Sequence, residues 1–153
     1  MDRPFAVIEV ARRFRYPLCM KYLILFILTL AGIYWLSEQE PSRVVASDDI
    51  YVVDGDTIKI DGESYRLMGF DTPETYRSEC ASELALGNQA TARLRELIDQ
   101  AAKITMNVEK GHDKYGRWLA TLAVDQKDVG DLLINEGLAR RYTGGTRRAW
   151  CSG

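Results

Sequence analysis

The sequence is poor in the residues that build two common kinds of catalytic site. Its 153 residues include one histidine and three cysteines. A single histidine, His112, excludes a metal centre with several histidine ligands, and no cysteine pair has the spacing of a zinc site. His112 lies in the polar segment 110–113, which predicts a turn at the surface. The sequence therefore gives little support to a site based on histidine or thiolate.

A strong excess of positive charge is also missing. From Pro41 onward, 15 Lys and Arg stand against 18 Asp and Glu. A protein that binds nucleic acid without cutting it usually has a marked basic excess. Positive charge is only local near the C-terminus, a pattern typical of a solvated tail: Arg140, Arg141, Arg147 and Arg148.

Long segments without charge are absent, with one exception. Residues 22–36 read YLILFILTLAGIYWL. This length fits the core of a signal peptide, whereas a membrane-spanning helix normally needs about 20 residues. The positive-inside rule leaves the N-terminus in the cytoplasm and exports the rest. Five basic residues precede the run: Arg3, Arg12, Arg13, Arg15 and Lys21.

These features divide the N-terminal part into three segments. We predict a basic cytoplasmic leader at 1–21, a signal-peptide core or transmembrane anchor at 22–36, and a linker at 37–49. Processing after Ala46 and retention as an anchor both stay open, as does a start at Met20 in place of Met1. The expected location is extracytoplasmic, either on the periplasmic face of the inner membrane as a single-pass protein or secreted after cleavage.

Export changes the interpretation of the cysteines. Cys80 and Cys151 lie in the exported part, where an oxidising compartment lets thiols pair. Two free thiols are the alternative, and we favour the disulfide. It would close a loop of about 70 residues, worth roughly 4 kcal/mol in the chain-entropy model.

The remaining pattern predicts a β-rich α+β domain at 50–142. Alternation and turn signals predict strands at 50–53, 57–60, 63–70, 104–108 and 118–124. In the third strand, Tyr65 and Leu67 are predicted to face one way and Arg66 and Met68 the other. Helical spacing predicts a helix at 81–103, whose apolar stripe we assign only to core packing. Asp128 and Gly137 delimit a short second helix. Five short strands and two helices suit an OB-fold barrel, preceded here by the N-terminal membrane or signal helix.

Acidic residues concentrate in two turns. Asp54 and Asp56 flank Gly55, and Asp71 and Glu74 follow the third predicted strand. If the first hairpin brings the turns together, their carboxylates converge into a hard-oxygen site for calcium or magnesium, with the Thr72 carbonyl as a further ligand. Two unrelated surface turns are the alternative.

Two arginines favour the functional interpretation. Arg66 lies on the strand that leads into the second acidic loop, and Arg117 follows a glycine in another turn. Guanidinium groups match the oxygens of a phosphodiester and stay charged. A cation, two arginines and a carboxylate that activates water together indicate phosphodiester hydrolysis.

These residues resemble the thermonucleases, the family of staphylococcal or micrococcal nuclease. The similarity extends over roughly Ile50 to Tyr142. Its motifs are Val53-Asp54-Gly55-Asp56-Thr57, the segment from Arg66 to Thr75, Asp113-Lys114-Tyr115-Gly116-Arg117, and Asn135-Glu136-Gly137-Leu138-Ala139.

The resemblance implies calcium-dependent hydrolysis of DNA and RNA that leaves 3′-phosphates. Asp56, Asp71 and the Thr72 carbonyl would bind Ca²⁺, with Asp54 as an indirect partner. Glu74 would act on the attacking water, and Arg66 and Arg117 would bind the phosphate. The resemblance also places Lys114 and Tyr115 near a terminal phosphate of the substrate. Tyr142 is a candidate for stacking on a base, and a place in the core as a packed aromatic is the alternative.

The chain departs from the family's type member at its C-terminus. The type member has a further long helix, whereas a short tail at 143–153 follows here. A disulfide between Cys80 and Cys151 would tie that tail near the metal loop. We expect a monomer without an obligate protein partner. The alternative function is an inactive, membrane-tethered OB module that binds single strands or a protein.

Overall fold

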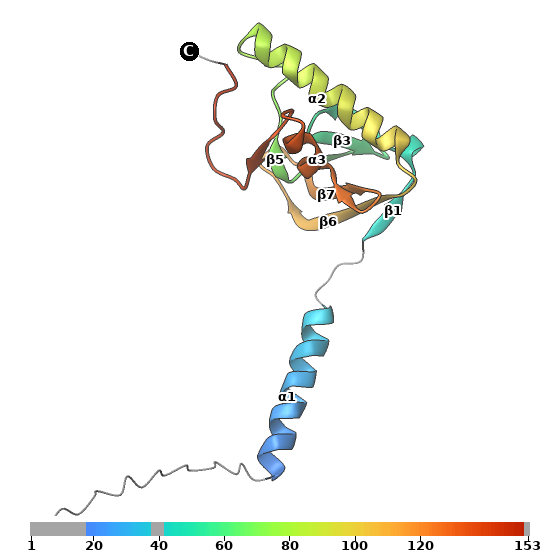
Figure 1. The fold of residues 1–153 in the computed structure, drawn as a ribbon, viewed down its shortest axis with the longest axis vertical. Helices are drawn as coiled ribbons and strands as arrows, with labels where there is room; N and C mark the ends of the chain where they lie inside the picture. The colour runs from blue at the N-terminus through green and yellow to red at the C-terminus, as the bar shows by residue number, and fades with distance from the viewer. Residues whose placement is uncertain (1–17, 38–41, 152–153) are drawn as a thin grey trace, which may run out of the picture. The chain divides into compact units, whose positions relative to one another are not determined.

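The computed structural model describes residues 18–37 and 42–151. The chain divides into two compact units, at Met1–Gln39 and Glu40–Gly153. Helix α1 (Leu18–Ser37) belongs to the first unit and contains the apolar run at 22–36 (Figure 1). No helix in the described part of the chain is long and apolar enough to cross a membrane. The predicted leader lies outside the described residues up to residue 17, as do linker residues 38–41.

The second unit is built on a mixed β-sheet with the strand order β1-β6-β7-β4-β3-β2, in which β8 also pairs with β7. Only β4 and β7 run parallel among the described pairs of this sheet. Two further strands, β5 and β9, form a separate antiparallel pair. The strands are β1 (Arg43–Val45), β2 (Tyr51–Asp54), β3 (Thr57–Ile60), β4 (Glu63–Leu67), β5 (Gly69–Asp71), β6 (Ile104–His112), β7 (Trp118–Val124), β8 (Lys127–Asp128) and β9 (Arg140–Tyr142).

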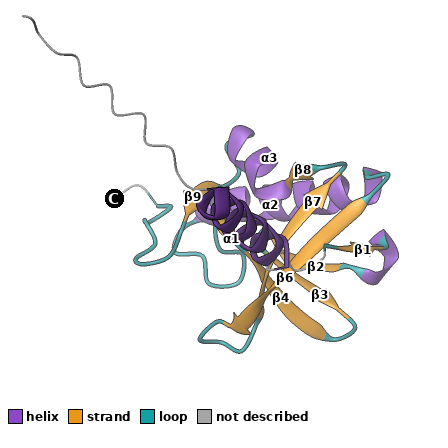
Figure 2. Cartoon of the chain, turned by 90° about the horizontal axis from the view of Figure 1, so that it is seen from below, coloured by secondary structure: helices purple, strands orange, loops and turns teal. Residues whose placement is uncertain are grey.

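Helices α2 (Ala81–Gln100) and α3 (Val129–Asn135) lie on one side of this sheet (Figure 2). The predicted start of α3 is confirmed, because Asp128 Oδ1 accepts a hydrogen bond from the Asp131 backbone N–H at 3.1 Å. Its predicted end is confirmed as well. Gly137 follows the helix with a φ of 75°, and the backbone N–H of Leu138 donates to the Leu133 carbonyl at 2.9 Å.

The core lies between the sheet and the two helices. Tyr65 and Leu67 of β4 point into it, as their alternation predicts, and Arg66 lies on the opposite face of the strand. Burial of this apolar surface fixes β4, the strand that leads into the acidic loop. The largest fully buried residues of the core are Phe70, Ile58, Leu67, Leu94, Ile98, Met106, Leu122 and Leu133.

Two predicted ends shift, because α2 ends at Gln100 instead of 103 and β6 continues to His112 instead of 108, which places His112 in a strand and not in a turn. Three further predictions need correction. The predicted linker at 37–49 is wrong for its second half, because β1 pairs with residues 104–106 of β6 and Val45 is buried in the core. The predicted strand at 63–70 divides at Met68 into β4 and β5, which join different sheets. The predicted five-stranded barrel is a half-barrel made of a mixed sheet, and β1 and β2 do not pair with each other among the described strands. The α+β class and the OB-like character are confirmed.

Candidate active site

Two glycines let the acidic turns approach each other. A Cβ atom on Gly55, in the turn between β2 and β3, would lie 2.8 Å from the Thr72 side chain. A Cβ atom on Gly87 of α2 would lie 2.7 Å from the Pro73 carbonyl oxygen. Atoms that are not bonded do not pack this closely. The turn at 54–56, the loop at 72–75 and α2 therefore pack together only because both positions lack a side chain.

Asp56 is the centre of the first acidic turn and is 5% exposed. Its Oδ2 accepts a hydrogen bond from the Thr72 backbone N–H at 3.4 Å, which joins the two turns. Asp54 supports the turn, because its Oδ1 accepts from the Asp56 backbone N–H at 3.1 Å. Burial raises the pKa of Asp56 to about 7; the charge of Arg66 opposes this rise, and the charge of Asp54 adds to it.

Arg66 bridges the two acidic turns. Its Nη2 lies 2.9 Å from Asp56 Oδ2 and 3.5 Å from Asp71 Oδ1. The same atom donates to the Phe70 carbonyl at 2.9 Å, so the guanidinium is fixed against the backbone that precedes Asp71. Burial lowers the pKa of Arg66, although the charges of Asp56 and Asp71 oppose the change. The predicted convergence of these three side chains is confirmed.

The converging oxygens fit a hard divalent cation. Asp56 and Asp71 are both 5% exposed, and Thr72 is 3% exposed. Asp71 Oδ1 is buried and accepts no hydrogen bond from a described residue; its contacts there are ion pairs with Arg66 and Arg147, at 3.5 Å and 3.0 Å. This oxygen therefore faces positive charge, which is the environment that a bound cation would also supply. Carboxylate and carbonyl oxygens are the ligands that calcium and magnesium prefer. These residues can therefore hold such an ion.

Glu74 follows in the same loop, and α2 holds its backbone. The Glu74 backbone N–H donates to Glu83 Oε1 at 3.3 Å, and the Glu79 backbone N–H donates to Glu83 Oε2 at 2.7 Å. Glu83 lies in the first turn of α2 and is 5% exposed. Sequence reasoning missed this residue because it assigned the helix only to core packing. An acidic residue in a first helical turn was the available signal.

Arg117 reaches the site from the turn between β6 and β7. Asp113 Oδ2 holds its guanidinium, at 2.8 Å from Nε and 2.7 Å from Nη2. Arg117 Nη1 donates to Thr57 Oγ1 at 3.1 Å, next to Asp56. Burial alone would raise the pKa of Asp113, but hydrogen bonds from Arg117 and from the Tyr115 backbone lower it. Asp113 therefore stays ionised and positions Arg117.

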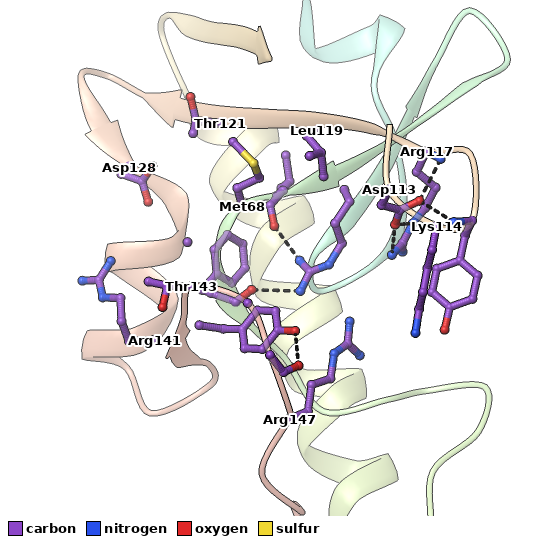
Figure 3. A pocket seen from close by; sticks show the side chains of 18 of the residues that line it. Met68, Asp113, Lys114, Arg117, Leu119, Thr121, Asp128, Arg141, Thr143 and Arg147 are labelled. Atoms are coloured by element: carbon purple, nitrogen blue, oxygen red, sulfur yellow. Dashed lines mark hydrogen bonds and ion pairs between the residues drawn. The ribbon is translucent and has the colours of Figure 1, made fainter. Parts of the chain in front are cut away.

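A cavity of about 990 Å³ lies beside these residues. Figure 3 shows Lys114, Arg117 and Arg147 among the side chains that line it. The Lys114 Nζ and the Arg117 guanidinium carbon lie 5.0 Å and 5.4 Å from the Tyr115 ring centroid. Tyr142 also lines the cavity and donates through its hydroxyl to the Gly145 carbonyl at 2.8 Å. Tyr142 therefore lies at the cavity and not in the hydrophobic core.

The segment after β9 reaches the site, as the predicted disulfide implied, but sequence reasoning missed the contacts of Arg147 there. Cys80 and Cys151 form a disulfide, as we favoured, which ties this segment to the start of α2. Arg147 Nε lies 3.0 Å from Asp71 Oδ1, and its Nη1 lies 2.7 Å from Glu74 Oε1. The interpretation of Arg147 as part of a solvated tail is therefore wrong. Only the disulfide prediction pointed to this location.

Comparison with known proteins agrees with this geometry. The family model described as staphylococcal nuclease homologue matches residues 64–149. Endonuclease YncB of Bacillus subtilis (strain 168) is 39% identical over 94 residues, which cover 58% of this chain and 44% of that protein. The thermonuclease of Staphylococcus hyicus is 32% identical over 95 residues, which cover 60% of this chain and 56% of that protein.

A third relative is the SPbeta prophage-derived endonuclease YokF of the same Bacillus strain. It is 40% identical over 94 residues, which cover 58% of this chain and 31% of that protein. The matched region thus spans between about a third and just over half of each of these three relatives. Because the family model matches more than half of the present sequence, the chain belongs to the staphylococcal nuclease homologue family.

Proposed function

We propose that this protein is a calcium-dependent nuclease that hydrolyses phosphodiester bonds of DNA and RNA. The main observation is the convergence of two buried carboxylates, Asp56 and Asp71, on the Arg66 guanidinium that lies between them. Glu74 and Arg117 approach the same place from separate segments. Relatives named endonuclease and thermonuclease support the same reaction class.

The cation site consists of Asp56, Asp71 and the Thr72 carbonyl. A calcium ion at these oxygens would supply positive charge that stabilises the negative charge developing on the phosphate. Calcium is proposed because the ligands are hard oxygens and because the resemblance to thermonucleases implies it. Asp54 maintains the turn that presents Asp56, and Glu83 maintains the loop that presents Glu74.

The remaining residues perform the phosphate chemistry. Glu74 accepts a proton from the attacking water, whose oxygen forms a bond to phosphorus. The bond between phosphorus and the 5′-oxygen breaks, and the leaving 5′-oxygen takes a proton from solvent. The products are a 3′-phosphate on one fragment and a 5′-hydroxyl on the other, and Glu74 later returns its proton to solvent. Arg66 and Arg117 donate hydrogen bonds to the phosphate oxygens, whose charge grows in the transition state.

The cavity would hold the nucleotide next to the cleaved bond. Lys114 and Tyr115 are proposed to contact a terminal phosphate, and Tyr142 is proposed to stack on a base. The aromatic and cationic side chains around the cavity support this assignment. Stacking tolerates every base, so little sequence preference is expected.

We also propose that the protein is exported and acts outside the cytoplasm, either released or retained at the membrane. The basic residues before the apolar run at 22–36 support export. The disulfide between Cys80 and Cys151 fits an oxidising compartment.

A cleavage assay tests the proposed activity. The full-length chain, purified in mild detergent, is incubated with end-labelled single-stranded DNA and RNA in calcium, in magnesium and in EDTA. Calcium-dependent cutting that leaves 3′-phosphate ends is expected. Equal cutting in EDTA would contradict the cation site, and binding without cutting would favour an inactive OB module.

A further inference from the structure

The segment at 143–151, here called the C-terminal clasp, is anchored on both sides of the active site. At its start, β9 pairs with β5, the strand that ends at Asp71. At its end, the disulfide joins Cys151 to Cys80. Arg140 of β9 also contacts the end of the clasp. Its guanidinium carbon lies 3.7 Å from the Trp150 ring centroid, and its Nη1 donates to the Ala149 carbonyl at 2.9 Å. The clasp is therefore held in a defined position.

The clasp places one cation directly on the acidic residues of the site. Arg147 contacts Asp71 Oδ1 at 3.0 Å and Glu74 Oε1 at 2.7 Å, through different nitrogen atoms. Trp150 Nε1 donates to the other oxygen of Asp71 at 3.4 Å. Burial alone would lower the pKa of Arg147, but the charges of Asp71, Asp56 and Glu74 outweigh this effect and raise it.

These contacts occupy oxygens that the proposed reaction uses otherwise. Asp71 is a proposed calcium ligand, and Glu74 is the proposed base. Two cations close to one carboxylate repel each other, and an oxygen that faces a guanidinium is less free to bind an ion. Arg147 therefore lowers the affinity of Asp71 for calcium. This holds whether Arg147 must leave the carboxylate when calcium binds or stays near the ion and repels it.

We propose that Arg147 is a built-in cation of the active site, which positions Asp71 and Glu74 and competes with calcium for them. The clasp thereby sets the calcium concentration at which the enzyme works, and the disulfide keeps Arg147 in place. This inference rests on the proposed function and assigns a positioning role to a residue outside the four motifs that carry the resemblance.

The size of the effect is limited by solvent. The Arg147 side chain is 37% exposed and that of Glu74 is 44% exposed, so water screens part of their interaction. We expect removal of the Arg147 charge to tighten calcium binding by about tenfold. Arg147→Lys keeps the charge but cannot contact Asp71 and Glu74 through two separate nitrogen atoms. Its affinity for calcium should therefore lie between those of the wild type and of Arg147→Gln.

Isothermal titration of calcium into the full-length protein tests the proposal without an activity measurement. The variants are Arg147→Gln, Arg147→Lys and the double variant Cys80→Ser/Cys151→Ser, with folding checked by circular dichroism. Arg148→Ala is the matched control, because Arg148 is the exposed neighbour and forms no ion pair with a described residue.

Tighter calcium binding in Arg147→Gln and in the double variant, with Arg148→Ala like the wild type, is the expected result. The calcium concentration for half-maximal cleavage should fall in the same order. Unchanged or weaker binding in Arg147→Gln would overturn the proposal, as would an equal gain in Arg148→Ala. If the wild-type protein binds no calcium, the proposed function fails together with the inference.

Discussion

Gly87 offers a test of how α2 positions the catalytic loop. In Gly87→Ala the new Cβ atom would lie 2.7 Å from the Pro73 carbonyl oxygen and 3.1 Å from the Glu74 carbonyl oxygen. Both contacts are with backbone, which cannot turn away as a side chain does. The Pro73 carbonyl must retreat by roughly 0.7 Å to reach an ordinary contact of about 3.4 Å.

Two opposing terms determine the stability of this variant. Alanine favours the helix by about 1 kcal/mol over glycine, whereas overpacking usually costs about 1–3 kcal/mol. The free energy of unfolding should therefore fall by between about 0 and 2 kcal/mol, a modest loss. Activity should fall further, by about 10- to 100-fold, because displacements near 1 Å misalign reacting groups.

Urea unfolding and the rate of cleavage at saturating calcium measure the two effects. Asn88→Ala, at the next and exposed helical position, is the matched control and should keep full activity. A Gly87→Ala enzyme that cuts as fast as the Asn88→Ala control would refute the claim that α2 sets the position of the loop.

Three further predictions concern other parts of the chain. Because burial raises the pKa of Asp56 to about 7, a proton competes with calcium for this carboxylate below that pH. Calorimetry should therefore show that the affinity of the protein for calcium increases about tenfold from pH 6 to pH 8. An affinity that does not change with pH would contradict this role of Asp56. Cys80→Ser/Cys151→Ser should lower the free energy of urea unfolding by up to about 4 kcal/mol, since the bridged cysteines are 71 residues apart. A chain that begins at residue 47 loses β1 and buried Val45, and should unfold about 2 kcal/mol more easily than one that begins at residue 42; equal stability would restore the linker interpretation.

The features that the sequence predicts well are local. The Asp-Gly-Asp turn and the loop from Asp71 to Glu74 are short motifs whose residues share one place in the fold. Alternation assigns Arg66 to the face opposite Leu67, and the cap at Asp128 needs only its own helix. Such features depend on neighbouring residues, so one sequence contains the information for them.

The features that it misses depend on distant pairing. Strand β1 has only three residues, and its partner in β6 lies about 60 residues further along the chain. Arg147 contacts Glu74 across a separation of 73 residues. Its own surroundings in the sequence are those of a basic tail, and nothing local distinguishes it from Arg148. The position of Arg147 follows from the disulfide and from β9, both of which are tertiary contacts.

The central claim is that Glu74 activates water at a calcium site formed by separate residues. Single-turnover cleavage of single-stranded DNA by Glu74→Gln, with calcium affinity measured on the same sample, tests it most directly. Calcium should still bind to Glu74→Gln while the cleavage rate falls by about 10²- to 10⁴-fold, the usual contribution of a general base. Wild-type cleavage by a folded, calcium-bound Glu74→Gln protein would contradict it.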